Sequence, residues 1–233
     1  MNYPLHMGII PDGCRRWASE KGSLPWDGHL KGIGVMETVS KWILSETPVK
    51  HLTAYGLSAS NLKRPASQLK ALEKLYSKYF IKLSKDKDIH ENQVRVGIIG
   101  SRNLLPEKIL DAADVAVEAT ANYDSKFFRV ALAYSGRQEI VDAVKKSGEK
   151  LSVESISQNL YSDYPDVDLI FRTSERRLSN FMLWASSYSE LYFLDKYWPD
   201  VSVDDIAWHL KTMIPVNEGT ENSYLRRLLI NGT

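Results

Sequence analysis

Two kinds of hydrophobic pattern alternate along this chain. Short apolar runs bounded by turn residues predict buried strands, and longer segments with apolar side chains three and four positions apart predict amphipathic helices. This alternation is typical of an α/β fold with helices on both faces of a parallel sheet. The predicted strands cover residues 5–10, 51–55, 94–99, 127–134, 168–171 and 191–193, and the main predicted helices cover 35–43, 65–84, 105–120, 137–146 and 203–213.

The segment after Pro65 predicts a long helix with one broad apolar face, and the charged stretch 82–91 behind it predicts a loop. Packing in the core is the simpler interpretation of such a face. The alternative is that the face lines a cavity for a ligand with a long apolar tail. Its apolar positions are Leu69, Leu72, Leu75, Tyr76, Tyr79, Phe80 and Leu83.

Nothing in the pattern divides the chain, because no internal repeat, low-complexity segment or linker interrupts it. Its 233 residues suffice for a substantial core. We therefore expect a single domain over residues 1–233, with a central parallel sheet of about six strands flanked by helices.

Arginine recurs where the predicted strands end. In parallel sheets, ligands gather outside the carboxyl ends of the strands. Each of these segments alone is simply interpreted as a solvated loop. Together on one edge of one sheet they favour a site for two phosphate-bearing groups. The four segments cover residues 11–16, 58–65, 134–137 and 172–180.

The first of these segments contains the clearest candidate for metal chemistry. Pro11-Asp12-Gly13 is a turn sequence, and a strand, glycine turn and helix start in succession direct backbone N–H groups toward one point, which suits a phosphate. Arg15 and Arg16 add positive charge. A carboxylate beside an anion site is explained if Mg²⁺ lies between the carboxylate and the anion. We therefore predict that Asp12 is a magnesium ligand.

Charge and composition narrow the function further. Thirty Lys and Arg residues against 29 Asp and Glu give a net charge of +1, so no global field attracts nucleic acid, and we expect no nucleic-acid partner. A single cysteine excludes an internal disulfide and a cysteine-based zinc site. No signal-peptide pattern or bilayer-length apolar run occurs, and a cytoplasmic location is expected. The two common nucleotide-binding motifs, Gly-x-x-x-x-Gly-Lys-Ser/Thr and Gly-x-Gly-x-x-Gly, are both absent from the sequence, which disfavours an ordinary nucleotide-binding fold.

Six motifs, taken in order, resemble those of the cis-prenyltransferase (undecaprenyl diphosphate synthase) family over nearly the whole length. The family's Asp-Gly-Asn-(Gly/Arg)-Arg-Trp-Ala, Gly-His-x-x-Gly and Tyr-x-x-Ser-x-x-Asn-x-x-Arg-Pro correspond to residues 12–18, 28–32 and 55–65. Tyr-Gly-Gly-Arg, the late Arg-Thr…Glu-x-Arg-x-Ser-Asn-Phe motif and Glu-Leu-Tyr-Phe…Trp-Pro-Asp correspond to 134–137, 172–181 and 190–200. Six motifs in the family's order make the resemblance specific.

The resemblance implies an enzyme that joins isopentenyl diphosphate to an allylic prenyl diphosphate and forms a cis double bond in a short- or medium-chain product. It also implies an apolar tunnel, a homodimer, Mg²⁺ as cofactor, and peripheral membrane contact through the lipid product. Asp12 and Glu190 would be the metal-side carboxylates. Asp12, Asn61 and Ser58 would take part in catalysis, the last two near the proton that is lost. The allylic diphosphate would be held by Gly13, Cys14, Arg15, Arg16, His29 and Arg64, and isopentenyl diphosphate by Arg172, Arg177 and Ser179. Further substrate-binding residues would be Trp17, Ser60 and Leu62.

The chain departs from the family pattern at several points. Cys14 stands for the usual Asn, Leu62 for a Trp and Ala133 for an Asn, the loop at Ser174 is one residue short, and the tail lacks the usual Arg-Phe-Gly ending. Pro25 and Gln68 stand where the family often has Arg and Glu. Two alternatives therefore stay open: irregular condensation of two allylic diphosphates, as in lavandulyl-type synthases, and a non-catalytic partner subunit. The intact Asp12, Arg15 and Arg16 disfavour the second.

Overall fold

The computed structural model describes residues 5–161 and 163–213. Its strands are β1 (His6–Ile10), β2 (His51–Ser58), β3 (Val94–Ile99), β4 (Lys126–Tyr134), β5 (Leu169–Thr173) and β6 (Glu190–Leu194). Its helices are α1 (Cys14–Glu20), α2 (Pro25–Glu46), α3 (Ala66–Leu83), α4 (Lys87–Glu91), α5 (Glu107–Ala119), α6 (Gly136–Ser147), α7 (Val153–Gln158) and α8 (Val203–Met213). Short 3-10 turns cover Ala59–Lys63, Arg102–Leu104 and Trp198–Asp200.

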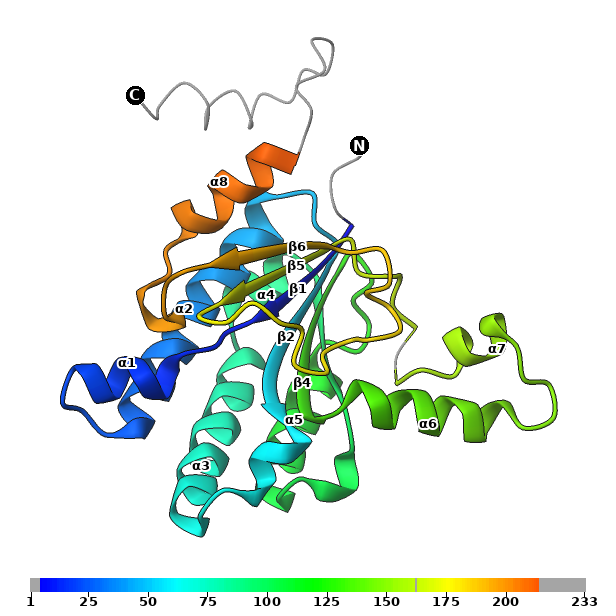
Figure 1. The fold of residues 1–233 in the computed structure, drawn as a ribbon, viewed down its shortest axis with the longest axis horizontal. Coiled ribbons are helices and arrows are strands. Elements are labelled where there is room, and N and C mark those ends of the chain that lie inside the picture. The colour runs from blue at the N-terminus through cyan, green and yellow to red at the C-terminus, as the bar shows by residue number, and fades with distance from the viewer. Residues whose placement is uncertain (1–4, 162, 214–233) are drawn as a thin grey trace, which may run out of the picture.

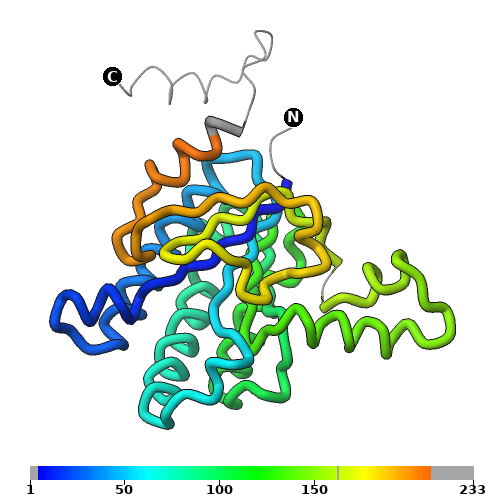
Figure 2. Tube along the Cα trace, in the orientation of Figure 1, coloured from blue at the N-terminus to red at the C-terminus, as the bar shows by residue number. Residues whose placement is uncertain are grey.

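The six strands form one parallel sheet in the order β3-β4-β2-β1-β5-β6 (Figure 1). β1 lies inside the sheet, with β2 on one side and β5 on the other, as the Cα trace also shows (Figure 2). The strands that follow β1 in the chain, β2 to β4, therefore extend the sheet on one side of β1, and β5 and β6 extend it on the other side. The carboxyl ends of β1 and β5 flank the point where the direction of winding changes, which is where open α/β sheets bind ligands.

The two faces of the sheet bury different partners. On one face, Met7, Ile9 and Leu52 join a large core with residues of α2, α3, α5 and α8. On the other, Ile10 and Ile170 join a smaller core in which Phe181 and other residues of the segment before β6 take part. Gly8 is needed for that second layer, because a Cβ there would lie 2.9 Å from Cε1 of Phe181.

The structure confirms the predicted fold class and all six predicted strands. The predicted helix at 65–84 is also confirmed, as α3. The prediction of a loop over 82–91 is wrong in part, because α4 forms there. Asp86 accepts a hydrogen bond from the backbone N–H of Asp88 (3.0 Å) and so caps α4, while buried Ile89 anchors it to the core. None of the helices in the two described ranges has both the length and the apolarity needed to cross a bilayer.

Candidate active site

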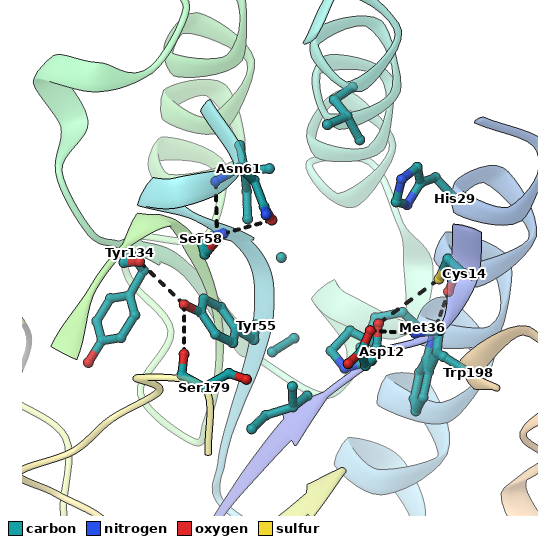
Figure 3. Close-up of a pocket in the computed structure, with 18 of the residues that line it drawn as sticks. Asp12, Cys14, His29, Met36, Tyr55, Ser58, Asn61, Tyr134, Ser179 and Trp198 are labelled. Atoms are coloured by element: carbon teal, nitrogen blue, oxygen red, sulfur yellow. Dashed lines mark hydrogen bonds between the residues drawn. The ribbon is translucent and has the colours of Figure 1, made fainter. Parts of the chain in front are cut away.

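A cavity of about 840 Å³ lies at the carboxyl edge of the sheet. Its polar end collects the residues that follow β1, β2, β4 and β5, and its other end is lined by apolar side chains of α2, α3 and β4. Figure 3 shows two walls: Asp12, Cys14, His29 and Trp198 form one, and Tyr55, Ser58, Asn61, Tyr134 and Ser179 form the other. The strand ends that the sequence singled out therefore meet at one site.

Asp12 is fixed in a rigid turn. Thr173, at the end of the neighbouring strand β5, accepts a hydrogen bond from the Asp12 N–H (3.0 Å) and donates one to its carbonyl (2.8 Å). Gly13 has a φ of 97°, and a Cβ there would lie 2.5 Å from Cδ1 of Tyr197, so only glycine suits the position. The backbone thus holds the Asp12 carboxylate at the cavity.

Arg172 is the central cation of the site, and 2% of the residue is exposed. Its guanidinium donates to Asp12 Oδ2 (2.8 Å), Glu175 Oε2 (2.9 Å), Ser179 Oγ (2.6 Å) and the carbonyl of Arg177. Its Nε has no hydrogen-bond partner in the described part of the chain. A buried cation of this kind is stable because several acceptors surround it.

Glu175 holds three arginines together. Beyond Arg172, its carboxylate lies 3.4 Å from Arg16 Nη2 and 2.5 Å from Arg177 Nη2, and Arg16 Nη2 also lies 3.3 Å from Asp12 Oδ1. Two carboxylates therefore serve three guanidinium groups. We call Asp12, Arg16, Arg172, Glu175 and Arg177 the arginine cluster.

His29, Arg15 and Arg64, for which the resemblance implies an allylic role, all line the cavity. Neither arginine forms an ion pair in the described ranges, although both line the cavity. Burial, then Arg64 and Arg15, lowers the pKa of His29 to about 4, so its ring is neutral at pH 7. Burial and Arg15 lower the pKa of Arg64. Two unpaired cations beside a neutral imidazole provide donors for an anion.

The Gly-His-x-x-Gly motif explains how His29 reaches the cavity. A Cβ at Gly28 would lie 2.0 Å from the Cys14 carbonyl oxygen, and one at Gly32 would lie 2.8 Å from Cys14 Sγ. The two glycines therefore let α1 press against α2. Burial, then Asp12, raises the pKa of the Cys14 thiol to about 12, so this residue is an uncharged lining group.

On the opposite wall, Ser58 and Asn61 begin the turn after β2. Ser58 Oγ accepts the Asn61 N–H (3.3 Å) and hydrogen-bonds Ser60 Oγ (2.8 Å). Tyr55 donates its hydroxyl to the carbonyls of Tyr134 and Ser179, both at 3.4 Å. The wall thus joins the ends of β2 and β4 to the loop after β5.

The apolar end fits part of the prediction made for α3. Leu72, Leu75, Tyr76 and Tyr79 line the cavity, whereas Leu69 and Phe80 are not among the lining residues. Phe80 is fully buried in the main core. The predicted role of α3 as a cavity wall therefore applies to Leu72 and Tyr76, and not to Leu69 and Phe80.

Three predicted site residues lie outside the cavity. Trp17 donates its indole N–H to Asp200 (2.8 Å), and Leu62 packs against the main core. Glu190 is exposed at the amino end of β6, whereas Asp12 follows the carboxyl end of β1. The strand register separates these carboxylates by about five residues, or roughly 15 Å along the strands. One chain does not bring them together, and the metal role of Glu190 stays a prediction.

Glu175 and Tyr55 are two of the site residues to which the sequence assigned no role. Both residues belong to family motifs, but the position of Glu175 among arginines did not indicate a role for its carboxylate. The signal that could have found Glu175 is its spacing, because it lies three residues after Arg172 in the loop.

The polar end suits a hard divalent cation. Its donors are carboxylate, hydroxyl and carbonyl oxygens, which Mg²⁺ prefers. No group of three or more His, Cys, Asp or Glu side chains in the described residues could enclose a metal. Magnesium is commonly held by one or two carboxylates together with substrate phosphates, so Asp12 fits such a site.

Comparison with known proteins gives a consistent result. A family described as "Putative undecaprenyl diphosphate synthase" matches residues 10–214. A tritrans,polycis-undecaprenyl-diphosphate synthase (geranylgeranyl-diphosphate specific) of Methanopyrus kandleri is 43% identical, covering 87% of this chain and 79% of that protein. An isoprenyl transferase of Fusobacterium nucleatum is 40% identical, covering 88% and 90%.

Solved structures share the fold. Lavandulyl diphosphate synthase from Lavandula x intermedia, solved with dimethylallyl diphosphate, matches with a TM-score of 0.81 and 29% identity, covering 90% of this chain and 94% of that one. A probable undecaprenyl diphosphate synthase from Campylobacter jejuni matches with a TM-score of 0.77 and 26% identity, covering 94% and 100%.

Proposed function

Because the chain belongs to the undecaprenyl diphosphate synthase family of prenyltransferases, we propose that it elongates an allylic prenyl diphosphate with isopentenyl diphosphate to give a medium-chain cis product. The observation that carries the proposal is that one continuous cavity has arginines at one end and apolar side chains at the other. Such a cavity suits a diphosphate bearing an apolar chain.

Two anion sites divide the polar end. Arg15, Arg64 and the neutral His29 bind the allylic diphosphate. Arg172, Arg177 and Ser179 bind isopentenyl diphosphate, which replaces Glu175 as the partner of Arg177. Bidentate guanidinium groups suit both phosphates.

The reaction breaks the allylic carbon–oxygen bond, and the terminal double bond of isopentenyl diphosphate forms the new carbon–carbon bond. The diphosphate leaves with the bonding electrons, and a proton leaves the condensing unit beside Ser58 and Asn61. The arginines stabilise the charge that develops on the leaving group. Leu72, Tyr76 and their neighbours exclude water that would capture the allylic cation. Mg²⁺ bound at Asp12 would add charge stabilisation to the leaving diphosphate.

The relatives' names suggest a primer. Seven of them are described as geranylgeranyl-diphosphate specific. We therefore expect geranylgeranyl diphosphate to be the preferred allylic substrate. A homodimer belongs to the same proposal, because only a second copy could bring a Glu190 near Asp12.

One alternative has a specific observation in its favour, namely the structural likeness to a lavandulyl diphosphate synthase. The test incubates the purified protein with Mg²⁺, labelled isopentenyl diphosphate and dimethylallyl, geranyl, farnesyl or geranylgeranyl diphosphate in turn. Elongated products, longest with geranylgeranyl diphosphate, support the proposal. A product from dimethylallyl diphosphate alone supports irregular condensation, and no product in any mixture overturns both.

A further inference from the structure

One of the four arginine segments predicted at the strand ends, residues 134–137, takes no part in the proposed binding of either diphosphate. Tyr134 and Ser135 line the cavity, whereas Arg137 is exposed and does not line it. The segment joins β4 to α6, and we call it the β4–α6 turn. Its arginine therefore supplies no positive charge to the cavity, unlike the arginines of the other three segments.

The loop after β5 has a strained backbone beside that turn. Ser179, Asn180 and Met182 all have a positive φ, at 49°, 64° and 43°. Residues other than glycine rarely adopt this conformation, although Asn tolerates it better than most, and it persists where surrounding contacts fix it. We call residues 177–182 the Ser179 loop.

Asn180 joins the Ser179 loop to the β4–α6 turn through both its backbone and its side chain. Its carbonyl accepts the Gly136 N–H (2.9 Å), its side-chain oxygen accepts the Arg137 N–H (2.9 Å), and its side-chain amide donates to Ser135 Oγ (2.8 Å). A Cβ at Gly136 would lie 3.0 Å from the Asn180 carbonyl oxygen, so glycine permits this close approach. We call these three hydrogen bonds the Asn180 clamp.

The clamped loop carries two of the acceptors that orient Arg172. The Arg172 guanidinium donates to Ser179 Oγ (2.6 Å) and to the carbonyl of Arg177. Tyr55 holds the same loop from β2, because its hydroxyl donates to the Ser179 carbonyl (3.4 Å) (Figure 3). The position of the Arg172 guanidinium therefore depends on the position of the Ser179 loop.

We propose that Asn180 is a positioning residue, which holds the Ser179 loop against the β4–α6 turn so that Ser179 and Arg172 face the condensing diphosphate. This inference rests on the proposed function, in which those two residues bind isopentenyl diphosphate. Asn180 also lines the cavity, but Arg137 and Ser135 already engage its side-chain oxygen and nitrogen. Asn180 therefore acts through the loop and not by contact with substrate.

The test is Asn180→Gly, because glycine keeps the left-handed backbone and removes both side-chain hydrogen bonds. Steady-state kinetics with both substrates varied should show a KM for isopentenyl diphosphate raised on the order of tenfold, the scale of one hydrogen bond to a charged group. The KM for the allylic diphosphate should stay close to that of the native chain, because Arg15, His29 and Arg64 come from other segments.

Gln93→Gly is the matched control. Gln93 also has a positive φ (49°), and its side-chain oxygen accepts a hydrogen bond from Ser125 (3.1 Å), but it does not line the cavity. This variant should keep the native KM values. An equal rise in both variants, or an equal rise for both substrates in Asn180→Gly, would show a general loss of rigidity and overturn the proposal.

Amide hydrogen exchange measures the clamp without any turnover. In Asn180→Gly the Arg137 N–H loses its acceptor and should exchange about tenfold faster or more, as expected where local opening becomes easier. The Gly136 N–H keeps the carbonyl of residue 180 and should change less. Unchanged exchange at Arg137 would show that the clamp does not form, and would overturn the proposal.

A double variant separates positioning from direct contact with substrate. If Asn180 acts through Ser179, adding Asn180→Gly to Ser179→Ala should raise the KM for isopentenyl diphosphate less than Asn180→Gly does alone. Full additivity would show that Asn180 contacts the substrate independently, and would overturn the positioning role. Should Asn180→Gly fail to fold, Ser135→Ala removes one bond of the clamp and should give a smaller rise in the same KM.

The outcomes for this inference and for the proposed function differ. A native chain without turnover on any allylic diphosphate would reject the proposed function, and the role of Asn180 with it. An active native chain whose Asn180→Gly variant keeps the native KM for isopentenyl diphosphate would overturn only the role of Asn180.

Discussion

Two clusters of polar groups lie on this sheet, and they are built in opposite ways. The arginine cluster at the carboxyl edge consists of full charges that face a cavity. The second, which we call the tyrosine cluster, consists of Glu139, Tyr134, Tyr161, Tyr164 and His6. It satisfies one carboxylate mainly with hydroxyl groups, and Tyr134 is its one member that also lines the cavity.

The contacts of Glu139 show how completely this second cluster is satisfied. Glu139 is almost fully buried and accepts hydrogen bonds from the hydroxyls of Tyr134 and Tyr164 (2.7 Å for Tyr164) and from the Tyr161 N–H (3.2 Å). Burial and the adjacent carboxylate raise the pKa of both tyrosines, so they remain donors. All the hydrogen-bond partners of Glu139 are other groups of the protein, so this cluster offers no place for a ligand.

The arginine cluster has the opposite property. Arg16, Arg172 and Arg177 share the carboxylates of Asp12 and Glu175, and Arg172 Nε has no partner in the described chain. The ion pairs of the half-exposed Arg16 and the mostly exposed Arg177 contribute little to stability, so a diphosphate can replace their partner at little cost. The comparison teaches that burial of charge alone does not identify a binding site. A binding site is identified by charged groups whose protein partners a ligand can replace. Changes in the arginine cluster should therefore alter activity, and changes in the tyrosine cluster should alter stability.

The largest expected effect is that of Asp12→Asn. This variant keeps the shape of the turn but removes the charge needed for a metal, and we expect turnover to fall by about a thousandfold or more, the scale of losing a principal electrostatic contact. The melting temperature should fall only modestly, because Glu175, Ser179 and the Arg177 carbonyl still accept from Arg172 and the backbone contacts of Thr173 remain. Asp195→Asn, an exposed partner of Arg176, is the matched control. Near-native turnover would show that Asp12 is only a turn residue.

Next comes Glu139→Leu, which should act on stability. It leaves two tyrosine hydroxyls and one backbone N–H without their acceptor, at about 1–3 kcal/mol for each unsatisfied group. We expect the free energy of unfolding, measured by chemical denaturation, to fall by about 3 kcal/mol or more. Tyr164→Phe removes one donor only and should cost about 1 kcal/mol. If Glu139→Leu instead abolished turnover in a fully stable protein, the distinction between the clusters would be wrong.

Arg177→Ala should raise the KM for isopentenyl diphosphate more than tenfold, since a charge-assisted hydrogen bond contributes about 1.5–3 kcal/mol. Its stability should be unchanged, because the side chain is mostly exposed. Arg176→Ala is the control, as Arg176 pairs with Asp195 away from the cavity. Steady-state kinetics with both substrates varied distinguish the outcomes, and equal KM values for the two variants would place Arg177 outside the site.

Most of the fold and much of the site could be predicted from the sequence, for a physical reason. Strands show their burial as apolar runs, and parallel strands bring their carboxyl ends to one edge. The sequence therefore predicts that Asp12 and Arg172 lie close together, and their side chains are 2.8 Å apart. Glycines with special geometry, such as Gly13, also leave a clear signal in turns.

What could not be predicted depends on long-range packing. Glu139, Tyr134 and Tyr164 come from α6, β4 and the loop before β5, and no periodicity connects them. Similarly, Leu72 and Phe80 belong to one apolar face in the sequence and both pack in the main core, yet of the two only Leu72 also lines the cavity. Only the position of α3 against the sheet separates the two roles.

The smallest expected effect is a pH dependence of stability that originates in the tyrosine cluster. His6 is completely buried; its ring nitrogens contact the Pro165 carbonyl (2.8 Å) and the Thr53 hydroxyl (2.9 Å). Burial, only partly offset by Pro165, lowers the pKa of His6 from 6.5 to about 3. Between these pH values the unfolded chain binds a proton that the folded chain does not, so stability is complete above pH 6.5 and falls as the pH drops toward 3.

Between pH 7 and pH 6 this single group should therefore lower the free energy of unfolding by roughly 1 kcal/mol or less. His6→Gln removes the titrating group, so denaturation at several pH values should give a shallower dependence than in the native chain. The dependence should not vanish, because burial also lowers the pKa of His29 and His51 to about 4. A carboxylate whose pKa is lowered in the fold, such as Asp86, contributes stability that is lost only below its ordinary pKa of 3.8. Such groups therefore do not change the free energy of unfolding between pH 7 and pH 6. Identical slopes of unfolding free energy against pH for the native chain and His6→Gln would show that His6 can be protonated in the folded state. The tyrosine cluster would then accept a charge, as the arginine cluster does.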